Sequence, residues 1–496
     1  MPGWSLEMSI NSTQRCLGFV FVSLLIAVPA LQVHAAEPSR VPVDLNRIQG
    51  VLSVVSGDPA PWESRADASK FFLLDDNQTT TEVFLAEDMV RAAGGADRLD
   101  GSRVELVIES YWDVFGGQLF TKIPVARSIL ILSDGTRSKA AKAVSGSKPW
   151  VSILCKFSDV SAEPKSLSYF QNMYASTYPG LDHYWRELSY NIANVAGSNA
   201  VAWVNLPHPV SHYETPDGGD LNAMALDCTA AADPHVHFPN FVGINMMFNS
   251  TFGPYAWGGS RYLFLDGVSR RYSVTWEPPW GYNDICVIAH EMGHGFGLPH
   301  SNNAEGGYPY DNPWDVMSNS WGYGLFDSTY ETLGKHTIAY HKDKLGWIGA
   351  GEKLDISSSG IYWANLDHLA LQSTSNYRMV TIQIPGSSRY YTLEVRDLEG
   401  YDGRLPGFAV IIHDVDTARL EDAWLVDPVA PANGADEGAM WRVGECFDDE
   451  AHQIEVCVHA VTAEGFTVRI AYGDVGGIFD DGFESGDIDT WSGFLP

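Results

Sequence analysis

Short apolar runs alternate with Gly, Asp and Asn turns from residue 37 to about residue 145. Runs such as KFFLLD, EVFLA and RVELVIESYWDVF have the length and the aromatic and β-branched content of strands. They predict a β-rich N-terminal domain over residues 36–145, which is either a propeptide or a permanent module. Residues 138–149, SKAAKAVSGSKP, are small and basic and are expected to form a linker and a candidate processing site.

The pattern changes at residue 146. The apolar runs PWVSILCKFSD, AVAWVNLP and FVGINMMFN predict strands, whereas residues 166–176 and 180–195 carry apolar positions at helical spacing. This mixture predicts an α+β domain over residues 146–349. Beyond it, six turn-separated runs between residues 360 and 473 predict a β-sandwich-like domain over residues 350–473.

The two ends of the chain have distinct compositions. Arg15 precedes the uncharged run CLGFVFVSLLIAVPALQ, and VHAA offers small residues for cleavage after Ala35, so residues 1–35 are expected to be a signal peptide. The protein should therefore be secreted, with cell-surface association as a second option and no stable membrane insertion. Residues 474–496 form an acidic, Gly- and Asp-rich tail. Ca²⁺ is a second candidate cofactor there, although the tail lacks the ligand register of a calcium loop.

The net charge limits the kinds of binding partner, and the positions of the cysteines suggest which disulfides form. The chain has 31 basic and 62 acidic residues, a net charge of -31, which argues against nucleic acid as a partner. Cys446 and Cys457 flank a short polar segment and are expected to form a disulfide, Cys228 with Cys286 is a second candidate pair, and Cys155 is expected to be a buried free thiol. The oligomeric state does not follow from the sequence.

Three histidines and a glutamate fall within HEMGHGFGLPH, residues 290–300. A helix from an N-cap at Asn283–Asp284 to about Phe296 would place His290 and His294 one turn apart on one face, with Glu291 beside them. Gly297 can end this helix in a left-handed conformation and Pro299 prevents its continuation, so that His300 can turn back as a third ligand. Three imidazoles and a water form an open, catalytic type of Zn²⁺ site.

The alternative is that these histidines occur together by chance at the end of a helix and have no chemical role. The pattern His-Glu-x-x-His-x-x-Gly-x-x-His fixes five positions and would arise by chance in roughly one in ten thousand chains of this length. It resembles the signature of the metzincin zinc endopeptidases. A methionine turn follows in this family, and NPWDVMSNS supplies Met317, which the resemblance makes a structural floor beneath the ligands.

Flanking segments extend the resemblance over about residues 150–470. ILCKFSD, LDHYWRELSYNIANVAG, KDKLGWI and YYTLEVRDLEGYDGRLPGFAVIIHDVD are similar to the secreted immune inhibitor A and gametolysin-type branches. The resemblance implies a twisted sheet plus an active-site helix. Some metzincins place a tyrosine two residues after the turn methionine, where this chain has Asn319. Others block zinc with a propeptide cysteine. Residues 37–148 contain no cysteine, and no carboxylate is singled out as a substitute.

The expected activity is that of a secreted zinc-dependent endopeptidase acting on a protein or peptide. Zinc would activate a water and polarise the scissile carbonyl, while Glu291 takes the proton of the water and delivers it to the leaving amine. The substrate is expected to lie along an edge strand within residues 255–267. Two alternatives remain, a surface-binding or adhesion protein on a zincin scaffold and a zinc hydrolase of a non-peptide amide. His235 and His237 form a second metal candidate, against a surface loop.

Overall fold

The computed structural model describes residues 46–63, 68–116, 119–134, 143–303, 310–419, 421–429 and 432–474. These residues form a mixed fold of helices and strands in which sheet predominates, which confirms the predicted mixture at this level. The expected signal peptide, most of the basic half of the linker and nearly all of the acidic tail lie outside the described residues. Within the described ranges, no helix combines the length and the apolar character needed to cross a membrane.

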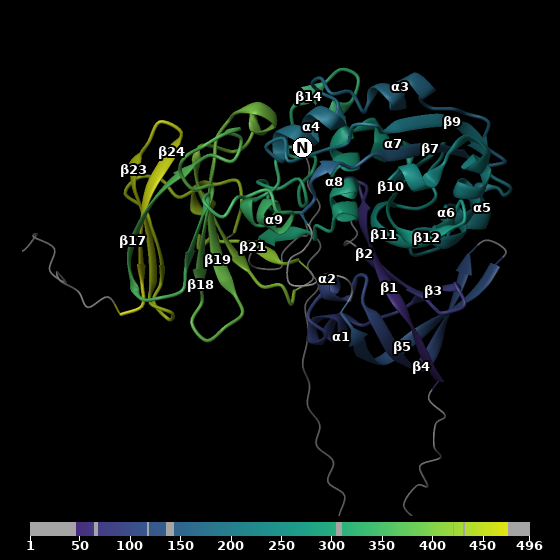
Figure 1. Cartoon of the computed structure of the whole chain (residues 1–496), viewed down its shortest axis with the longest axis horizontal. Coiled ribbons are helices and arrows are strands. Elements are labelled where there is room, and N and C mark those ends of the chain that lie inside the picture. Colours follow the sequence, from purple (N-terminus) through teal and green to yellow (C-terminus); the bar gives the residue numbers. More distant parts are fainter. Residues whose placement is uncertain are drawn as a thin grey trace, which may run out of the picture. The chain divides into compact units, whose positions relative to one another are not determined.

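A ten-stranded sheet contains strands from both sides of residue 145 (Figure 1). Its main path runs β3-β2-β1-β11-β12-β10-β7-β9, and β4 and β5 extend it from β1. Its N-terminal strands are β1 (Asn46–Pro59), β2 (Ala68–Leu74), β3 (Thr80–Val83), β4 (Arg103–Gly116) and β5 (Leu119–Ser133). Its other strands are β7 (Trp150–Lys156), β9 (Asn199–Asn205), β10 (Gly243–Phe248), β11 (Tyr255–Leu265) and β12 (Val268–Glu277).

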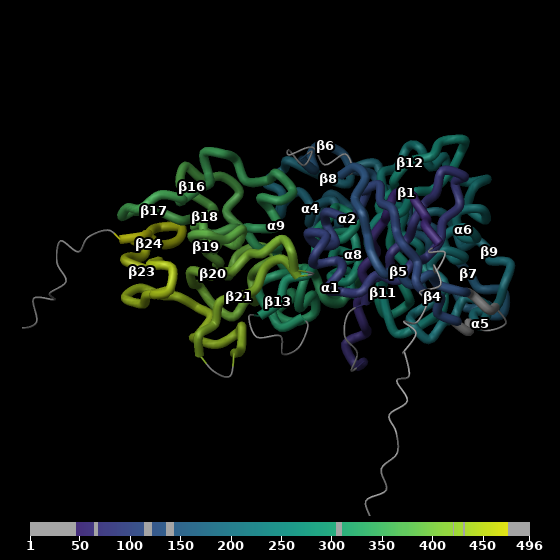
Figure 2. The backbone as a smooth tube through the Cα atoms, turned by 90° about the horizontal axis from the view of Figure 1, so that it is seen from below, coloured from purple at the N-terminus to yellow at the C-terminus, as the bar shows by residue number. Residues whose placement is uncertain are grey.

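The junction between the two parts of this sheet is the antiparallel pair β1–β11 (Figure 1 and Figure 2). Val55 lies opposite Gly259 and Pro59 opposite Tyr255, so five residue pairs connect the strands. The N-terminal strands, with α1 (Glu87–Ala92) and α2 (Ala96–Leu99), also have a core of their own, which includes Leu52. The N-terminal part thus folds around its own interior and adds its first strand to the larger sheet.

Helices cover both faces of the sheet around β7. Val151 and Ile153 point into a core shared with α6, whereas Trp150 and Leu154 point into a core shared with α4 and α8. Burial on both faces explains why this strand reads as a continuous apolar run. The helices of this part are α3 (Leu167–Asn172), α4 (Leu181–Leu188), α5 (Val210–Tyr213), α6 (Leu221–Ala232), α7 (Pro279–Asn283), α8 (Ile285–Phe296) and α9 (Ala339–Lys344).

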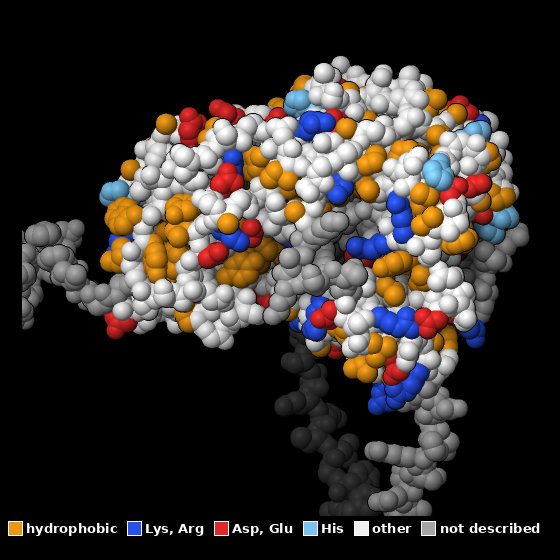
Figure 3. Space-filling view, in the orientation of Figure 1, with side chains coloured by type: hydrophobic (Ala, Val, Ile, Leu, Met, Phe, Trp, Pro, Cys, Tyr) orange, Lys and Arg blue, Asp and Glu red, His pale blue; other side chains and the backbone are white. Residues whose placement is uncertain are grey.

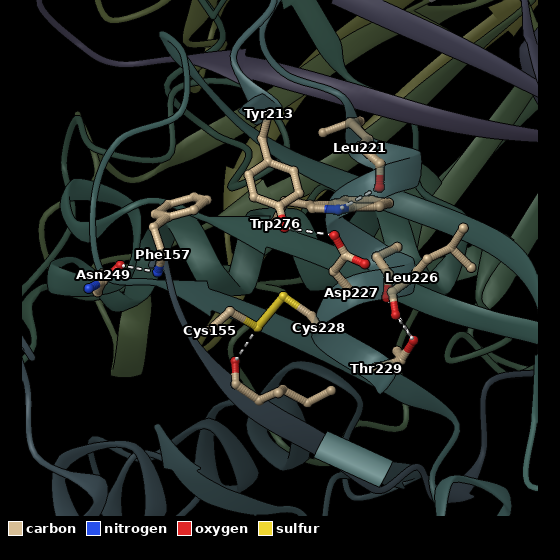
Figure 4. The surroundings of a disulfide bond; sticks show 12 residues. Cys155, Phe157, Tyr213, Leu221, Leu226, Asp227, Cys228, Thr229, Asn249 and Trp276 are labelled. Carbon is tan, nitrogen blue, oxygen red and sulfur yellow. Dashed lines mark hydrogen bonds between the residues drawn. A yellow bond between two sulfur atoms is a disulfide. The ribbon is translucent and has the colours of Figure 1, made fainter. Parts of the chain in front are cut away.

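The cysteines pair differently from two of the expectations. Cys155 on β7 forms a disulfide with Cys228 on α6 (Figure 4). Cys286 is buried and has a free thiol. The predictions of a free Cys155 and of a Cys228–Cys286 pair are therefore wrong. Helix α6 packs on the face of β7 that carries Cys155, a contact between residues 73 positions apart that local sequence does not reveal. The predicted Cys446–Cys457 disulfide is confirmed, between paired strands.

Two further sheets make up the C-terminal part and share one core. The first has the order β13 (Ser301–Asn303), β21 (Ala423–Leu425), β20 (Ala409–Val415), β19 (Tyr390–Arg396), β18 (Met379–Gln383) and β16 (Lys353–Ile356). The second has the order β17 (Gly360–Asp367), β24 (Gly465–Tyr472), β23 (Ile454–Val461) and β22 (Cys446–Asp449). The outward side of the second sheet carries Ile361 and Trp363, both about half exposed, and apolar side chains gather at that end in Figure 3.

Short strand pairs and single-turn helices complete the fold. The strands are β6 (Gly146–Ser147), β8 (Ala193–Asn194), β14 (Phe326–Asp327) and β15 (Glu331–Thr332). The 3-10 turns are η1 (Asp233–His235), η2 (Phe238–Asn240), η3 (Gly400–Asp402) and η4 (Glu437–Ala439).

Candidate metal centre

Helix α8 ends as its sequence predicts. It runs from Ile285 to Phe296, and Gly297 follows in the left-handed conformation with φ of 97°. The amide of Leu298 donates to the carbonyl of Gly293, which closes the helix end and turns the chain back toward the helix. The apolar positions Ile288 and Met292 point into the core behind the helix, so the opposite face is left for polar side chains.

The three predicted histidines converge on one point. The Nε2 atoms of His290 and His294 lie 3.1 Å apart, and that of His300 lies 3.2 Å from the first and 3.0 Å from the second. Two zinc ligands at tetrahedral angles and bonds of about 2.05 Å would be separated by about 3.3 Å. The spacing of the three nitrogens therefore fits a common metal ion.

The second nitrogen of the helical histidines is held by the backbone. Nδ1 of His290 lies 2.6 Å from the carbonyl oxygen of Val316, and Nδ1 of His294 lies 2.8 Å from that of Leu298. Donation to these carbonyls places the ring proton on Nδ1 and leaves the Nε2 lone pair free, the tautomer that a metal ligand needs. Burial lowers the pKa of His294 to about 4, which keeps this ring neutral.

Glu291 is buried beside the histidines. Strand β11 approaches it closely, because a Cβ added at Gly258 would lie 2.4 Å from the carbonyl oxygen of Glu291 and 2.7 Å from its Oε2. Burial is the largest cause that raises the pKa of Glu291 well above its usual value, and the charges of the nearby Asp58 and Glu277 carboxylates raise this pKa further. The carboxyl predicted to act as the base therefore lies beside the converging histidines in an acidic, dry environment.

Asp58, from strand β1, contacts all three histidines, and the sequence did not single it out. Its Oδ1 lies 3.0 Å from Nε2 of His290 and 2.9 Å from Nε2 of His300, and its Oδ2 lies 3.4 Å from Nε2 of His294. Burial would raise the pKa of Asp58, but the histidines outweigh it and hold this pKa well below the usual value. The four side chains form one buried cluster of metal-ligating atoms.

Glu277 is a third carboxyl of this region that sequence reasoning missed. It ends strand β12 and is fully buried, and burial together with the charge of Asp58 raises its pKa to about 8. Its only local signal is its position, since it closes a strand shortly before helix α8. The aspartate at position 58 has still less signal, because nothing in SGDPAP indicates which distant strand it pairs with.

Met317 packs against helix α8 at Gly293, next to His294 in the sequence. It is fully buried, and its Sδ lies only 2.4 Å from where a Cβ on Gly293 of helix α8 would be. Asp315 holds the turn in place, because it accepts hydrogen bonds from the backbone amide of Met317 and from the hydroxyl of Ser301, directly after the third histidine. Its partner His341 on helix α9 lies 2.9 Å away.

The remaining candidates do not join this cluster. His235 lies at the end of η1, and His237 is 62% exposed with Asp266 as its neighbour, and neither belongs to a potential metal-ligating group among the described residues. The prediction of an edge strand within residues 255–267 is wrong, because β11 lies between β1 and β12 in the sheet and is paired along Tyr255–Gly259 with β1. The acidic tail, a candidate for Ca²⁺, lies outside the described residues beyond its first position.

Comparison with protein-family models, with curated proteins and with solved structures finds no match for this chain. The chemical interpretation of the site therefore depends on its own geometry.

Proposed function

We propose that the chain is a secreted zinc-dependent endopeptidase with a metzincin-type catalytic domain. One observation carries the proposal, namely that the Nε2 atoms of His290, His294 and His300 converge to within 3.2 Å of one another. Glu291, the next residue after the first of them, lies buried beside the same point. Three neutral imidazoles with a neighbouring carboxylate are the donor set of a catalytic zinc site.

The residues divide the work as follows. His290, His294 and His300 would hold the ion, which when bound lowers the pKa of a water and polarises a carbonyl. Glu291 accepts a proton from the attacking water and returns it to the leaving amine. Met317 supports the ligands from below without binding the ion, and the carbonyls of Val316 and Leu298 keep two rings in the ligating tautomer.

Two features support export and a polypeptide substrate. The disulfides Cys155–Cys228 and Cys446–Cys457 suit an oxidising compartment, as the expected signal peptide does. Strand β11 passes directly beside helix α8 and pairs along Tyr255–Gly259 with the extended strand β1, so a peptide substrate would pair there in place of β1.

The alternative is a surface-binding protein on a zincin scaffold. The exposed side chains of Ile361, Trp363 and Val461 on the outer sheet are the observation that favours it. A binding protein has no need of a buried carboxyl next to the metal ligands, and Glu291 is therefore the residue that separates the two proposals.

The experiment measures bound zinc and the hydrolysis of labelled casein by the full chain, during extended incubation, for the wild type, Glu291→Gln and Glu450→Gln. Glu450 is exposed on the C-terminal part and serves as the matched control. We expect one zinc per chain in all three, and hydrolysis by the wild type and the control only. The loss of a general base should reduce the rate by about 10²- to 10⁴-fold.

Two results would contradict the proposal. Hydrolysis by Glu291→Gln at the rate of the wild type would remove the assigned role of the carboxyl. Zinc bound by the wild type without cleavage of casein or of a mixed peptide library would favour the binding protein instead.

A further inference from the structure

We infer that the C-terminal part contains a second metal site, in which His368, Asp397, Glu399 and Glu464 bind a divalent ion of the Mn²⁺ type. His368 directly follows β17, Asp397 and Glu399 follow β19, and Glu464 lies in the turn between β23 and β24. Strands β17, β23 and β24 belong to one sheet of this part and β19 belongs to the other. None of the four residues takes part in the proposed peptidase chemistry, so the inference does not rest on that proposal.

Backbone hydrogen bonds hold the three segments together at this end of the two sheets. The amide of His368 donates to the carbonyl of Glu464 at 2.8 Å, and the amide of Leu369 donates to the carbonyl of Val395 at 3.0 Å. His368 also forms a parallel bridge with Val395. The side chains of the cluster therefore start from main-chain positions that are fixed by the sheets.

His368 is the buried centre of the cluster. Its side chain is fully buried, and within the described part of the chain neither ring nitrogen has a hydrogen-bond partner. Buried polar side chains normally have at least one partner, so an imidazole without any requires an explanation. Its Nε2 points at two carboxylates, because it lies 3.6 Å from Oε2 of Glu464 and 3.9 Å from Oε2 of Glu399.

The separations leave room for an ion among these atoms. The ligating atoms of His368, Asp397 and Glu399 all lie within 4.8 Å of one another. An ion with bonds of about 2.1–2.3 Å separates neighbouring ligand atoms by about 3.0–3.8 Å. The cluster is therefore slightly wider than a filled ligand shell. Glu399 and Glu464 can close this difference, because their side chains are 61% and 50% exposed and are free to move inward.

An ion pair with a protonated His368 accounts less well for the geometry. A charged imidazole would draw mobile carboxylates to the short distances of charge-assisted hydrogen bonds, about 2.7–2.9 Å. The distances of 3.6 and 3.9 Å from its Nε2 are too long for any hydrogen bond. A cation between nitrogen and oxygen satisfies both atoms at the separations observed, which a proton on the ring does not.

The donor set favours Mn²⁺ among the common divalent ions. Ca²⁺ and Mg²⁺ take oxygen ligands, so the buried imidazole of His368 would remain unused. Structural Zn²⁺ sites are built from cysteine and histidine, and this cluster has one histidine and three carboxylates. Carboxylates suit Mn²⁺, and as a transition metal it also accepts an imidazole nitrogen.

This site should hold its ion more weakly than the three-histidine centre holds zinc. Two of its carboxylates are half exposed or more, and ligands that must be ordered on binding reduce the affinity. Mn²⁺ is also the weakest binder among the divalent ions of the first transition row. The single zinc expected per chain therefore belongs to the histidine centre, and the second site fills when Mn²⁺ is supplied.

The test titrates the zinc-loaded full chain with Mn²⁺ and counts the bound ion from the loss of the free-ion electron paramagnetic resonance signal. The chains are the wild type, His368→Gln, Glu399→Gln/Glu464→Gln and the matched control Glu450→Gln, whose carboxyl is exposed in another turn of the same part. Electron spin echo modulation then shows whether an imidazole nitrogen binds the Mn²⁺. Zinc at the three-histidine centre keeps Mn²⁺ away from it, because zinc binds such nitrogens more tightly.

We expect the wild type and the control to bind one Mn²⁺ with a dissociation constant below about 1 mM, the upper end for extracellular cation sites, and to show the nitrogen modulation. His368→Gln and the double variant should bind at least about 10-fold more weakly, because even residues behind the ligands change metal affinity by that factor. Urea midpoints identify a variant that fails to fold. If His368→Gln does so, the double variant decides, since both of its changes are on exposed side chains.

Three results would overturn the site. They are a wild type that binds no Mn²⁺ below about 1 mM, equal affinity in all four chains, and a nitrogen modulation that persists in His368→Gln. A chain that binds Mn²⁺ as expected and hydrolyses no peptide would refute the proposed peptidase and leave the second metal site standing.

Discussion

Replacing Gly258 by alanine tests the close approach between strand β11 and the helix that carries the site. The added Cβ would lie 2.4 Å from the carbonyl oxygen of Glu291 and 2.7 Å from its Cα. Neither atom can rotate away, since both belong to the backbone. Strand β11 cannot retreat easily either, because Gly258 is paired with Ser56 on one side and Thr275 on the other.

The displacement follows from these distances. An ordinary carbon–oxygen contact is about 3.4 Å, so helix α8 has to move by about 1 Å at Glu291. Overpacking of this kind costs about 1–3 kcal/mol of folding free energy. A shift of 1 Å in the catalytic geometry costs about 10²-fold in rate, so the larger effect should appear in activity.

The assay compares kcat/KM for a fluorogenic peptide and the urea midpoint between the wild type and Gly258→Ala. Gly351→Ala is the matched control, because a Cβ at Gly351 meets nothing within 4 Å. We expect Gly258→Ala to lose about 100-fold in kcat/KM, with a urea midpoint lowered by an amount equivalent to about 1–3 kcal/mol. A variant with the activity and midpoint of its parent would refute the proposed packing.

Three further predictions concern the support of the site. Gly293→Ala should lower the free energy of unfolding by about 1–3 kcal/mol, because its Cβ would lie 2.4 Å from Sδ of Met317. In urea titrations the double variant Gly293→Ala/Met317→Ala should lose at least about 1 kcal/mol less than the sum of the two single variants. Strict additivity of the two losses would contradict the contact. Asp315→Ala should lower the free energy of unfolding in urea titrations by about 3–5 kcal/mol, because it leaves His341 and three hydrogen-bond donors without their buried acceptor. A loss below about 1 kcal/mol would contradict this role of Asp315. Burial lowers the pKa of His413 to about 3, so between about pH 3 and 6.5 the unfolded chain binds a proton that the folded chain does not bind. The free energy of unfolding should therefore fall by about 2 kcal/mol from pH 7.5 to pH 5. His413→Gln should lose this share of the pH dependence, and an unchanged pH profile of stability in that variant would contradict the prediction.

The local features of the site could be predicted from sequence because each depends on neighbours within one turn. Helical spacing places His290 and His294 on one face, and the left-handed Gly297 returns the chain so that His300 joins them. The strands of the C-terminal part were likewise visible as turn-separated apolar runs, and β17, β18, β19, β20, β23 and β24 all lie where those runs predict.

The features that were missed depend on pairing between distant segments. Asp58 meets the histidines only because β1 pairs with β11, about 200 positions later, and the sequence of β1 carries no sign of that partner. The Cys155–Cys228 disulfide was missed for a similar reason. Several elements separate β7 from helix α6 in the sequence, and only the packing of α6 on β7 brings the two cysteines together. Propensity and periodicity describe each element and leave its neighbours in space undetermined.

The most direct measurement of the central claim is X-ray absorption at the zinc edge on the full chain loaded with one equivalent of zinc. The account predicts three imidazole nitrogens and at least one oxygen at about 2.0–2.2 Å, without sulfur. Fewer than three imidazoles, a sulfur ligand, or no stoichiometric zinc would contradict a metal centre built on His290, His294 and His300.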